Sequence, residues 1–462
     1  MRPVFVQKYG GTSLGRWDRL QEVANIIQND FNNGAELFVV VSAMSGKSKS
    51  EGTTSQLITA IEKSKIGEDY ETTIKPLEDY HQSAIDKLDE GVRPLAIELV
   101  SKVFTEARNL LDAVKILGDV PSALEDNILS AGEKISALII TQLLRSQGLP
   151  AEYLDFSNLM PVMNVSPDIT FLEMIIEKLI ERPEFKGHTQ KLFVIPGYLG
   201  RYPGGILNAV GRGYSDVTGG LIACAVKAKE YQIWKEVDGV MTADPRVVEA
   251  PIVLSHLTTE EAIELSAFGM QAVHAQAAEA MHKHKISVRI KNVLNPKSNG
   301  TLIDNSIPAD PNVPVRAVTA LKDITVVNIV SNKRQMGDLF LAEIFRILNK
   351  YKIKTELISI SQTNISICVN EKSISSNLRK ELDNWGEVTI FPKRAIISIV
   401  GSKMKHIIGI AGRTFNTLAG AGVNIEIISQ GATEISISAV VKEEDVAKAV
   451  QALHSHYIEK KH

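Results

Sequence analysis

A lysine followed by paired glycines stands near the start of the chain, in the motif KYGGTS from Lys8 to Ser13. The motif comes directly after a short apolar stretch that predicts a buried strand opening into a tight loop. Adjacent glycines let backbone N–H groups approach phosphate oxygens closely, and Lys8 can offset the charge on a transferring phosphoryl group. The motif indicates an anion-binding loop, although a Gly-Gly turn after a strand is also often only a turn.

A second polar loop follows the next predicted strand, in the sequence VVVSAMSGKS from Val39 to Ser48. Its GKS ending resembles a P-loop, but the glycine required five positions before Gly46 is replaced by Val41. The segment remains a Ser/Gly loop at a strand end, where Ser42 is suited to polar contacts with a substrate or a phosphate. A plain connecting loop is the alternative.

Two further motifs combine small residues with charged side chains on predicted helices. SAGEK, from Ser130 to Lys134, sets Glu133 where it could pack closely on a ligand or simply lie on a solvated helix surface. AVGRGYSD puts glycines on both sides of Arg212 and breaks the dinucleotide-binding fingerprint, because Asp216 occupies the place of its last glycine. The Arg212 guanidinium is suited to fork onto a carboxylate, whereas an aspartate at a helix start is often merely a cap.

The last motif, WKEVDGVMTADPRVV, runs from Trp234 to Val248 and follows a predicted strand with two successive turn pairs, Asp-Gly and Asp-Pro. A nucleotide base could lie on this loop. Lys235 and Arg246 would then offer positive charge to its phosphates.

These motifs need a scaffold whose strand ends meet, and the sequence predicts one. A largely helical stretch over 55–149 lies among predicted strands at 4–8, 37–42, 151–155, 192–195 and 232–237. Strands that alternate with helices indicate an α/β sheet. A proline-rich linker at 305–315 precedes two repeats of strand, helix and two strands. We therefore predict domains over 1–305, 315–392 and 393–462.

The composition of the 462-residue chain excludes several function classes. With 44% hydrophobic and 23% charged residues and a net charge of -3, nothing indicates a nucleic-acid or polybasic membrane partner. No apolar run approaches the ~20 residues of a membrane helix, and no signal or transit segment is recognisable, so we expect a cytoplasmic protein. Cys224 and Cys368 fit no zinc or disulfide pattern. His274, His282 and His284 lack metal-binding spacing and are expected on an exposed helix, so no metal site is predicted.

Together and in this order, the motifs resemble those of the aspartokinases, a branch of the amino acid kinase family, over the whole chain. The combination of K-[FY]-G-G-T-S, S-A-x-x-G, A-G-E, G-R-G-x-[ST]-D and D-G-x-x-[ST]-x-D-P-R is far more specific than any member alone. The GRGYSD and KEVDG variants look most like the fungal type. The resemblance implies an α/β fold of the carbamate kinase kind, with three layers around a mainly parallel sheet, followed by two α+β ACT domains.

The resemblance further implies transfer of the ATP γ-phosphate, with Mg²⁺, to the side-chain carboxylate of L-aspartate. The product would be 4-phospho-L-aspartate, at the head of lysine, threonine and methionine synthesis. The aspartate side chain has a reference pKa of about 3.9, so the nucleophile is already ionised at neutral pH and needs no general base. Lys8 matches the family lysine that stabilises the moving phosphoryl group, and Asp216 matches the carboxylate that orients Lys8 and the Mg-nucleotide.

Binding roles follow from the same resemblance. Glu133 matches the acid that faces the substrate ammonium, and Arg212 matches the arginine that grips the α-carboxylate. The same pocket would be lined by Ser42, Ser48 and Ser215. Nucleotide contacts are expected from Lys8, Gly10, Gly11, Ser13, Lys235, Glu236, Met241, Asp244 and Arg246.

The two C-terminal repeats resemble ACT domains, which pair across subunits and bind amino acids at the shared edge. We therefore expect feedback control by threonine or lysine and a homodimer or homotetramer, with a purely dimerising domain pair as the alternative. The sequence ends after the repeats, so we expect a monofunctional enzyme. The effector site would draw on Met336, Gly337, Lys354, Thr355, Glu356 and Asn424.

Two departures from the family pattern leave other functions open. Gln271 stands where bacterial relatives often place a lysine near the phosphates, and the pair His274-Ala275 stands where a His-Pro pair is common. They motivate the alternative of a catalytically weakened, amino-acid-sensing regulatory protein. A second alternative changes the acceptor to glutamate or a carbamate, but Glu133 with Arg212 fits an α-amino acid and argues against the carbamate.

Overall fold

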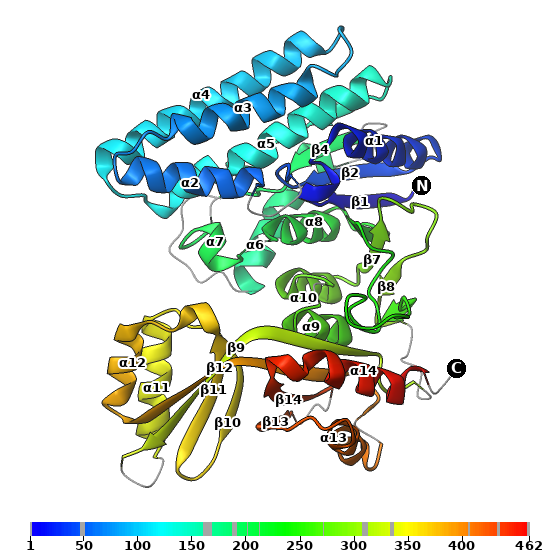
Figure 1. Ribbon diagram of the computed structural model, residues 1–462. Coiled ribbons are helices and arrows are strands. Elements are labelled where there is room, and N and C mark those ends of the chain that lie inside the picture. The colour runs from blue at the N-terminus through cyan, green and yellow to red at the C-terminus, as the bar shows by residue number, and fades with distance from the viewer. Residues whose placement is uncertain are drawn as a thin grey trace. The chain divides into compact units, whose positions relative to one another are not determined.

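The computed structural model describes the chain outside residues 1, 47–50, 160–168, 187–191, 201, 212, 271, 307–312, 333–336, 405–406, 432–434 and 460–462. The chain divides into two compact units, shown in Figure 1. The first contains Met1–Gly239 and Val273–Asn305, and the second contains Val240–Ala272 and Ser306–His462. The segment Val240–Ala272 therefore packs with the C-terminal unit, whereas the predicted first domain runs without interruption to residue 305.

The first unit is built on a mainly parallel sheet with strand order β3-β4-β2-β1-β5-β7-β8. All neighbours pair in parallel except β7 and β8, which are antiparallel. β2 reads ELFVVV and is buried at every position, as expected for a strand that is covered on both faces. The strands are β1 (Val4–Tyr9), β2 (Glu36–Val41), β3 (Ala151–Tyr153), β4 (Leu192–Pro196), β5 (Glu230–Lys235), β7 (Ser287–Asn292) and β8 (Thr301–Ile303).

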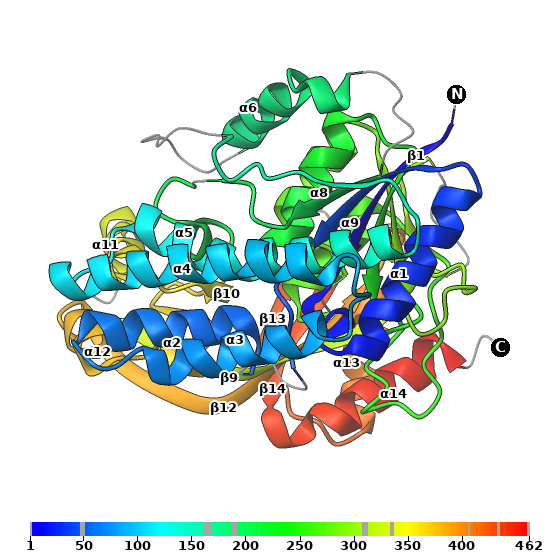
Figure 2. The ribbon, with the colours of Figure 1, turned by 90° about the horizontal axis from the view of Figure 1, so that it is seen from above.

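Helices cover both faces of this sheet, which gives the expected three layers. The helical stretch after β2 forms four helices that lie side by side as a bundle, and Figure 2 shows them from above. With α1 they share one apolar core with the side chains on one face of the sheet, and α8 and α10 cover the opposite face. The helices are α1 (Trp17–Asn32), α2 (Thr53–Lys65), α3 (Glu71–Ile85), α4 (Arg93–Leu117), α5 (Ser122–Ser146), α6 (Ile169–Ile180), α7 (Ile206–Ala209), α8 (Tyr214–Ala225) and α10 (Ala275–Lys283).

The carboxyl ends of the central strands meet at one edge of the sheet. Tyr9 at the end of β1 pairs with Val41 of β2 and with Trp234 of β5, and Val41 also pairs with Pro196 of β4. Loops that leave parallel strands at this edge form the usual ligand crevice of open α/β sheets. The motifs at 8–13, 42–46 and 235–238 all leave from it.

The second unit is an antiparallel six-stranded sheet with strand order β10-β11-β9-β12-β14-β13. Two 15-residue strands, β9 (Ala317–Ser331) and β12 (Gly386–Val400), run through both halves of the sheet and pair along their length. Both strands carry a residue with positive φ, Asp323 and Lys393, near the point where the halves meet. The predicted boundary at 392–393 thus falls inside a shared strand.

Each half of this sheet has its own helices and core. β10 (Thr355–Ile360) and β11 (Asn364–Asn370) belong with α11 (Asp338–Lys350) and α12 (Ser376–Asp383). β13 (Ile427–Gln430) and β14 (Ser436–Lys442) belong with α13 (Ile410–Gly420) and α14 (Val446–Tyr457). The predicted repeats of strand, helix and two strands are therefore present, each followed by a further helix.

The segment Val240–Ala272 belongs to this unit and contains β6 (His256–Leu257) and α9 (Thr259–Ala267). Its Ala243 and Val248 are buried in the same core as α13 and α14, and Thr242 Oγ1 lies 2.9 Å from Nε2 of the buried His454. Within the described ranges of the chain, no helix is long and apolar enough to cross a membrane.

Candidate active site

Lys8 and Asp216 form a buried ion pair at the edge where the strands end. Lys8 is the penultimate residue of β1, and Asp216 lies in the first turn of α8, with 2.5 Å between Lys8 Nζ and Asp216 Oδ1. Their side chains are only 8% and 14% exposed. Burial opposes ionisation of Asp216, but Lys8 and Lys235 outweigh it and hold the pKa of that carboxyl below its usual value. The pair fixes a lysine ammonium beside the glycine loop.

Glu133 is a second buried acid at this edge, supplied by α5. Its Oε1 accepts a hydrogen bond from the Tyr214 hydroxyl at 2.5 Å and one from the Ala43 backbone N–H at 3.3 Å. Its Oε2 is buried and has no hydrogen-bond partner within the described residues. Burial raises the pKa of Glu133 to about 7, against the lowering effects of Tyr214, Ala43 and Lys8. Glu133 is therefore not on a solvated helix surface, since only 2% of it is exposed.

Two serine hydroxyls next to these groups in the sequence contact each other. Ser42 Oγ lies 2.8 Å from Ser215 Oγ, which joins the loop after β2 to the start of α8. The close approach requires a glycine at the end of β4, because a Cβ on Gly197 would lie 2.5 Å from the Ser215 Cβ and 2.9 Å from the Val41 carbonyl oxygen.

The glycine loop is locked against the loop after β2. Gly11 to Ser13 form a short 3-10 turn, and Ser45 N–H donates to the Gly11 carbonyl at 3.0 Å. A Cβ on Gly11 would lie 2.4 Å from the Ala43 carbonyl oxygen, so only glycine fits there. The Ser13 hydroxyl is buried and has no partner in the described part of the chain. The loop thus offers close backbone, an unsatisfied hydroxyl and the Lys8 ammonium, the groups that an anion needs.

Comparisons with known proteins agree with this geometry. A model of the amino acid kinase family matches residues 3–292, and a model of the ACT domain matches residues 397–457. The chain is 38% identical to the aspartokinase of Saccharomyces cerevisiae over 485 residues, which cover 97% of this chain and 92% of that protein. The chain belongs to the aspartokinases.

Solved aspartokinases have the same fold. E. coli aspartokinase III, in a structure with aspartate and ADP, is 25% identical with a TM-score of 0.80, and the match covers 98% of this chain and 99% of that one. A structure of the same E. coli enzyme with lysine and aspartate matches at 25% identity and a TM-score of 0.78 over the same shares. The predicted family, the three-layer fold and the kinase class are therefore confirmed.

The expected nucleotide contacts of the aspartokinase fall into both units. Lys235 ends β5 and acts electrostatically on Asp216, so it lies near the Lys8–Asp216 pair. Glu236 follows it and is exposed. Met241, Asp244 and Arg246 belong to the second unit, where the Arg246 guanidinium pairs with the Asp244 carboxylate at 2.7 Å.

Several expected or noted positions lie outside the described residues. They are Ser48, Arg212, Gln271 and Met336.

Gly211 and Gly213 have φ angles of 86° and 103°, in the left-handed region that glycine adopts without strain. Both glycines of the GRG motif are thus required by the backbone.

Two residues of the site were not expected from the sequence. Tyr214 binds Glu133, yet its motif gave no sign of where the hydroxyl would point. His274 was expected on an exposed helix, but it is half-buried before α10, with Nε2 3.2 Å from the Val210 carbonyl oxygen and a charge effect on Asp216. His282 is exposed as expected, whereas His284 is half-buried and pairs with Glu173.

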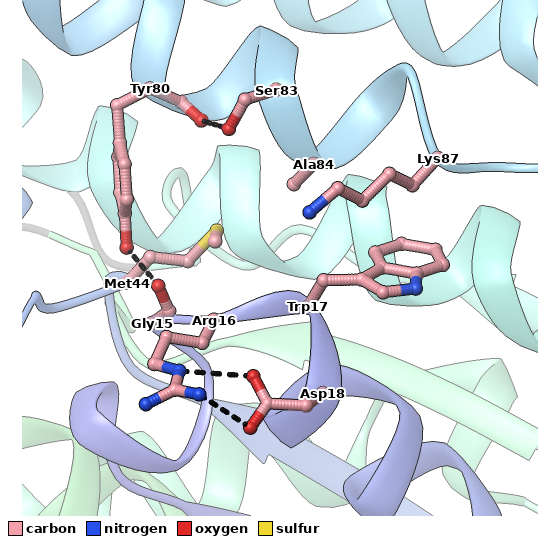
Figure 3. A pocket seen from close by; sticks show the side chains of 9 residues that line it. All are labelled: Gly15, Arg16, Trp17, Asp18, Met44, Tyr80, Ser83, Ala84 and Lys87. Carbon is pink, nitrogen blue, oxygen red and sulfur yellow. Dashed lines mark hydrogen bonds and ion pairs between the residues drawn. The ribbon is translucent and has the colours of Figure 1, made fainter.

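A pocket of about 560 Å³ adjoins the glycine loop on the side of α3 (Figure 3). The Tyr80 hydroxyl donates to the Gly15 carbonyl at 2.6 Å, and Arg16 binds Asp18 through two hydrogen bonds of 3.0 Å. The Tyr80 hydrogen bond therefore ties α3 to the segment that follows Ser13. Its lining residues are Gly15, Arg16, Trp17, Asp18, Met44, Tyr80, Ser83, Ala84 and Lys87.

The described effector candidates all lie in the second unit. Gly337 precedes α11, and Lys354 pairs with Glu356 at 3.0 Å around Thr355, the first residue of β10. Asn424 is exposed between α13 and β13. The strands β10 and β13 lie at the two ends of the strand order but contact each other through a shared apolar cluster. The sheet therefore brings the strand that begins at Thr355 close to the strand that follows Asn424.

Proposed function

We propose that the enzyme phosphorylates the side-chain carboxylate of L-aspartate with ATP and so forms 4-phospho-L-aspartate. The observation that carries this proposal is the buried Lys8–Asp216 pair, which holds an ammonium group at the strand ends beside the free Oε2 of Glu133. The structure of the E. coli relative with aspartate and ADP supports aspartate as the acceptor and an adenine nucleotide as the second substrate.

The reaction asks the protein for charge neutralisation and positioning. An ionised carboxylate attacks without a general base, and negative charge builds up on the phosphoryl oxygens. Lys8 supplies the opposing positive charge, and Asp216 keeps its ammonium in place. We assign the phosphate contacts to the Gly11 backbone and to the Ser13 hydroxyl, which has no partner in the described residues, with Gly10 in the same loop.

The acceptor amino acid has matching partners on this chain. Oε2 of Glu133 is a buried acceptor for its ammonium with no partner in the described residues. Further contacts are assigned to the hydroxyls of Ser42 and Ser215, which lie 2.8 Å apart. We assign the α-carboxylate to Arg212 and a further contact to Ser48. The nucleotide would use Lys235, Glu236, Met241, Asp244 and Arg246.

Magnesium fits these residues as a companion of the nucleotide. The described residues contain no group of three or more His, Cys, Asp or Glu side chains that could hold a metal, and Mg²⁺ is commonly bound by one or two carboxylates together with substrate phosphates. Asp216 is the carboxylate in place. When bound, the ion would neutralise charge on the phosphate oxygens.

The second unit would provide feedback control by lysine or threonine, with the effector bound near Gly337, Met336, Lys354, Thr355, Glu356 and Asn424. The E. coli relative with lysine supports an amino-acid effector. We propose pairing of subunits through these domains as a homodimer or homotetramer, and a place in lysine, threonine and methionine synthesis.

ADP release by the purified protein with Mg-ATP tests the function. We expect turnover with aspartate, little with glutamate, loss of turnover in Lys8→Ala, and inhibition by lysine or threonine. Amino-acid binding without turnover would instead identify a sensor whose kinase unit has lost catalysis.

A further inference from the structure

The Tyr214–Glu133 contact makes the two carboxylate oxygens of Glu133 differ in their hydrogen bonding. Tyr214 is the first residue of α8 and is 5% exposed. Its hydroxyl donates to Oε1 at 2.5 Å, and the Ala43 N–H donates to the same oxygen at 3.3 Å. Oε1 is therefore saturated by the protein, while Oε2 is buried with no hydrogen-bond partner in the described residues.

A buried carboxylate oxygen without a donor is costly unless a ligand supplies one. Lys8 is the cation that acts on Glu133, but its ammonium is bound to Asp216 at 2.5 Å. An external ammonium group therefore meets a single open oxygen whose direction is set by the bond on the other oxygen.

We propose that Tyr214 is a positioning residue, whose hydroxyl holds Glu133 through Oε1 and directs Oε2 at the ammonium group of the acceptor amino acid. The role rests on the proposed function, since it assumes that an α-amino acid is the acceptor. Tyr214 touches neither phosphate nor the attacking carboxylate in this scheme, so it should act on acceptor affinity rather than on the chemical step.

A dependence on pH follows from the groups around Glu133. These are Tyr214 from α8, Lys8 from β1 and the Ala43 N–H from the loop after β2, with Tyr198 and Asp126 acting on Tyr214. Burial raises the pKa of Glu133 to about 7 and Tyr214 opposes that rise. Only the ionised carboxylate attracts an ammonium group, so acceptor affinity should improve as pH increases through about 7. Loss of the hydroxyl should move this transition to higher pH.

Tyr214→Phe removes the hydroxyl and little else. At pH 7 we expect the KM for aspartate to rise by about 10- to 100-fold, the usual worth of a hydrogen bond to a charged group, with kcat and the KM for ATP within about threefold of wild type. The pH at which the KM for aspartate falls should increase. The matched control is Tyr70→Phe, since Tyr70 also donates to a carboxylate, Asp112, at 2.5 Å, but does so between α3 and α4. Tyr70→Phe should leave all these constants unchanged.

A double-mutant cycle separates positioning from a general packing effect. In a Glu133→Gln background, Tyr214→Phe should change the KM for aspartate by less than about twofold, because its partner charge is gone. A full additive effect in that background, or an unchanged pH transition in Tyr214→Phe, overturns the positioning role while aspartate turnover by the wild type stands. No aspartate turnover by the wild type overturns the proposed function and this role with it.

Discussion

Lys8 Nζ lies 2.5 Å from Asp216 Oδ1, and the two side chains come from different layers of the first unit. The lysine is fixed by a central strand, and the aspartate by the first turn of the helix that covers that strand. Removing one member of a buried pair leaves a charge without compensation, which typically costs more than the pair contributes. The contribution of the pair to stability and to the proposed catalysis can therefore be measured separately.

Lys8→Met should lower kcat by about 100- to 1000-fold, because one preorganised positive charge is lost from the transferring phosphoryl group. It should also destabilise the protein by about 3 kcal/mol, since Asp216 loses its ion-pair partner and only Lys235 and His274 then oppose the effect of burial on its pKa. Lys8→Met/Asp216→Asn should regain most of the stability and none of the activity. Thermal unfolding and ADP release measure the two effects. Equal instability of the single and double variants would contradict the pairing.

Gly11→Ala tests whether the glycine loop is set by its contact with the loop after β2. The new Cβ would lie 2.4 Å from the Ala43 carbonyl oxygen and 3.1 Å from the Ser45 Cβ, so the two loops must separate. We expect a loss of about 1–3 kcal/mol in stability and an increase of at least tenfold in the KM for ATP. Gly10→Ala is the control for stability alone, because its Cβ would have 4.0 Å to its nearest neighbour. Equal thermal stability of the two variants would show that the loops move apart freely.

Glu133→Gln should change how stability depends on pH. The native pKa of about 7 exceeds the ordinary value of 4.5, so the folded protein keeps a proton that the unfolded chain releases. This contribution is fully present below about pH 4.5 and is lost as pH rises to about 7, an effect of about 3 kcal/mol. Glutamine keeps an acceptor for Tyr214 but cannot titrate. Relative to wild type, the variant should therefore gain stability between pH 5 and pH 7.5 in thermal unfolding. Parallel pH profiles of wild type and Glu133→Gln would rule out a raised native pKa.

Local patterns in the sequence predicted the elements and the family. Apolar periodicity located β2, the helical stretch after it and the strands and first helix of each C-terminal repeat, because these signals are carried by neighbouring residues. The order of the motifs predicted the aspartokinase family, which the comparisons confirm. The nucleotide and effector contacts stay predictions.

The features of the structure that the sequence does not predict depend on contacts between segments that are distant in the sequence. Tyr214 reaches Glu133 only because α8 and α5 meet at the sheet edge. The sequence predicts two separate repeats, whereas β9 and β12 each run through both halves of the sheet. A strand that changes its partners along its length has no local sequence pattern that would predict this. Val240–Ala272 lies within the residues that the amino acid kinase family model matches, yet its apolar side chains Ala243 and Val248 are buried in the core of the second unit.

Glu261 is the residue at which the packing of Val240–Ala272 in the second unit is best tested. It is 1% exposed, and its Oε2 accepts from the Thr258 N–H at 3.0 Å to complete a capping box at the start of α9. Its Oε1 accepts from the backbone N–H and the hydroxyl of Ser402, both at 2.9 Å, in the loop after β12. One carboxylate therefore caps a helix and anchors it to the sheet.

Glu261→Ala should destabilise the second unit by about 2–4 kcal/mol, because buried N–H donors lose a charged acceptor at both places. Amide hydrogen exchange should become faster in α9 and around Ser402, while β1 in the first unit keeps its protection. Glu260→Ala is the matched control, since that neighbouring acid is exposed. Faster exchange in α9 with unchanged exchange at Ser402 would show that the anchor is dispensable and that Glu261 acts on its own helix alone.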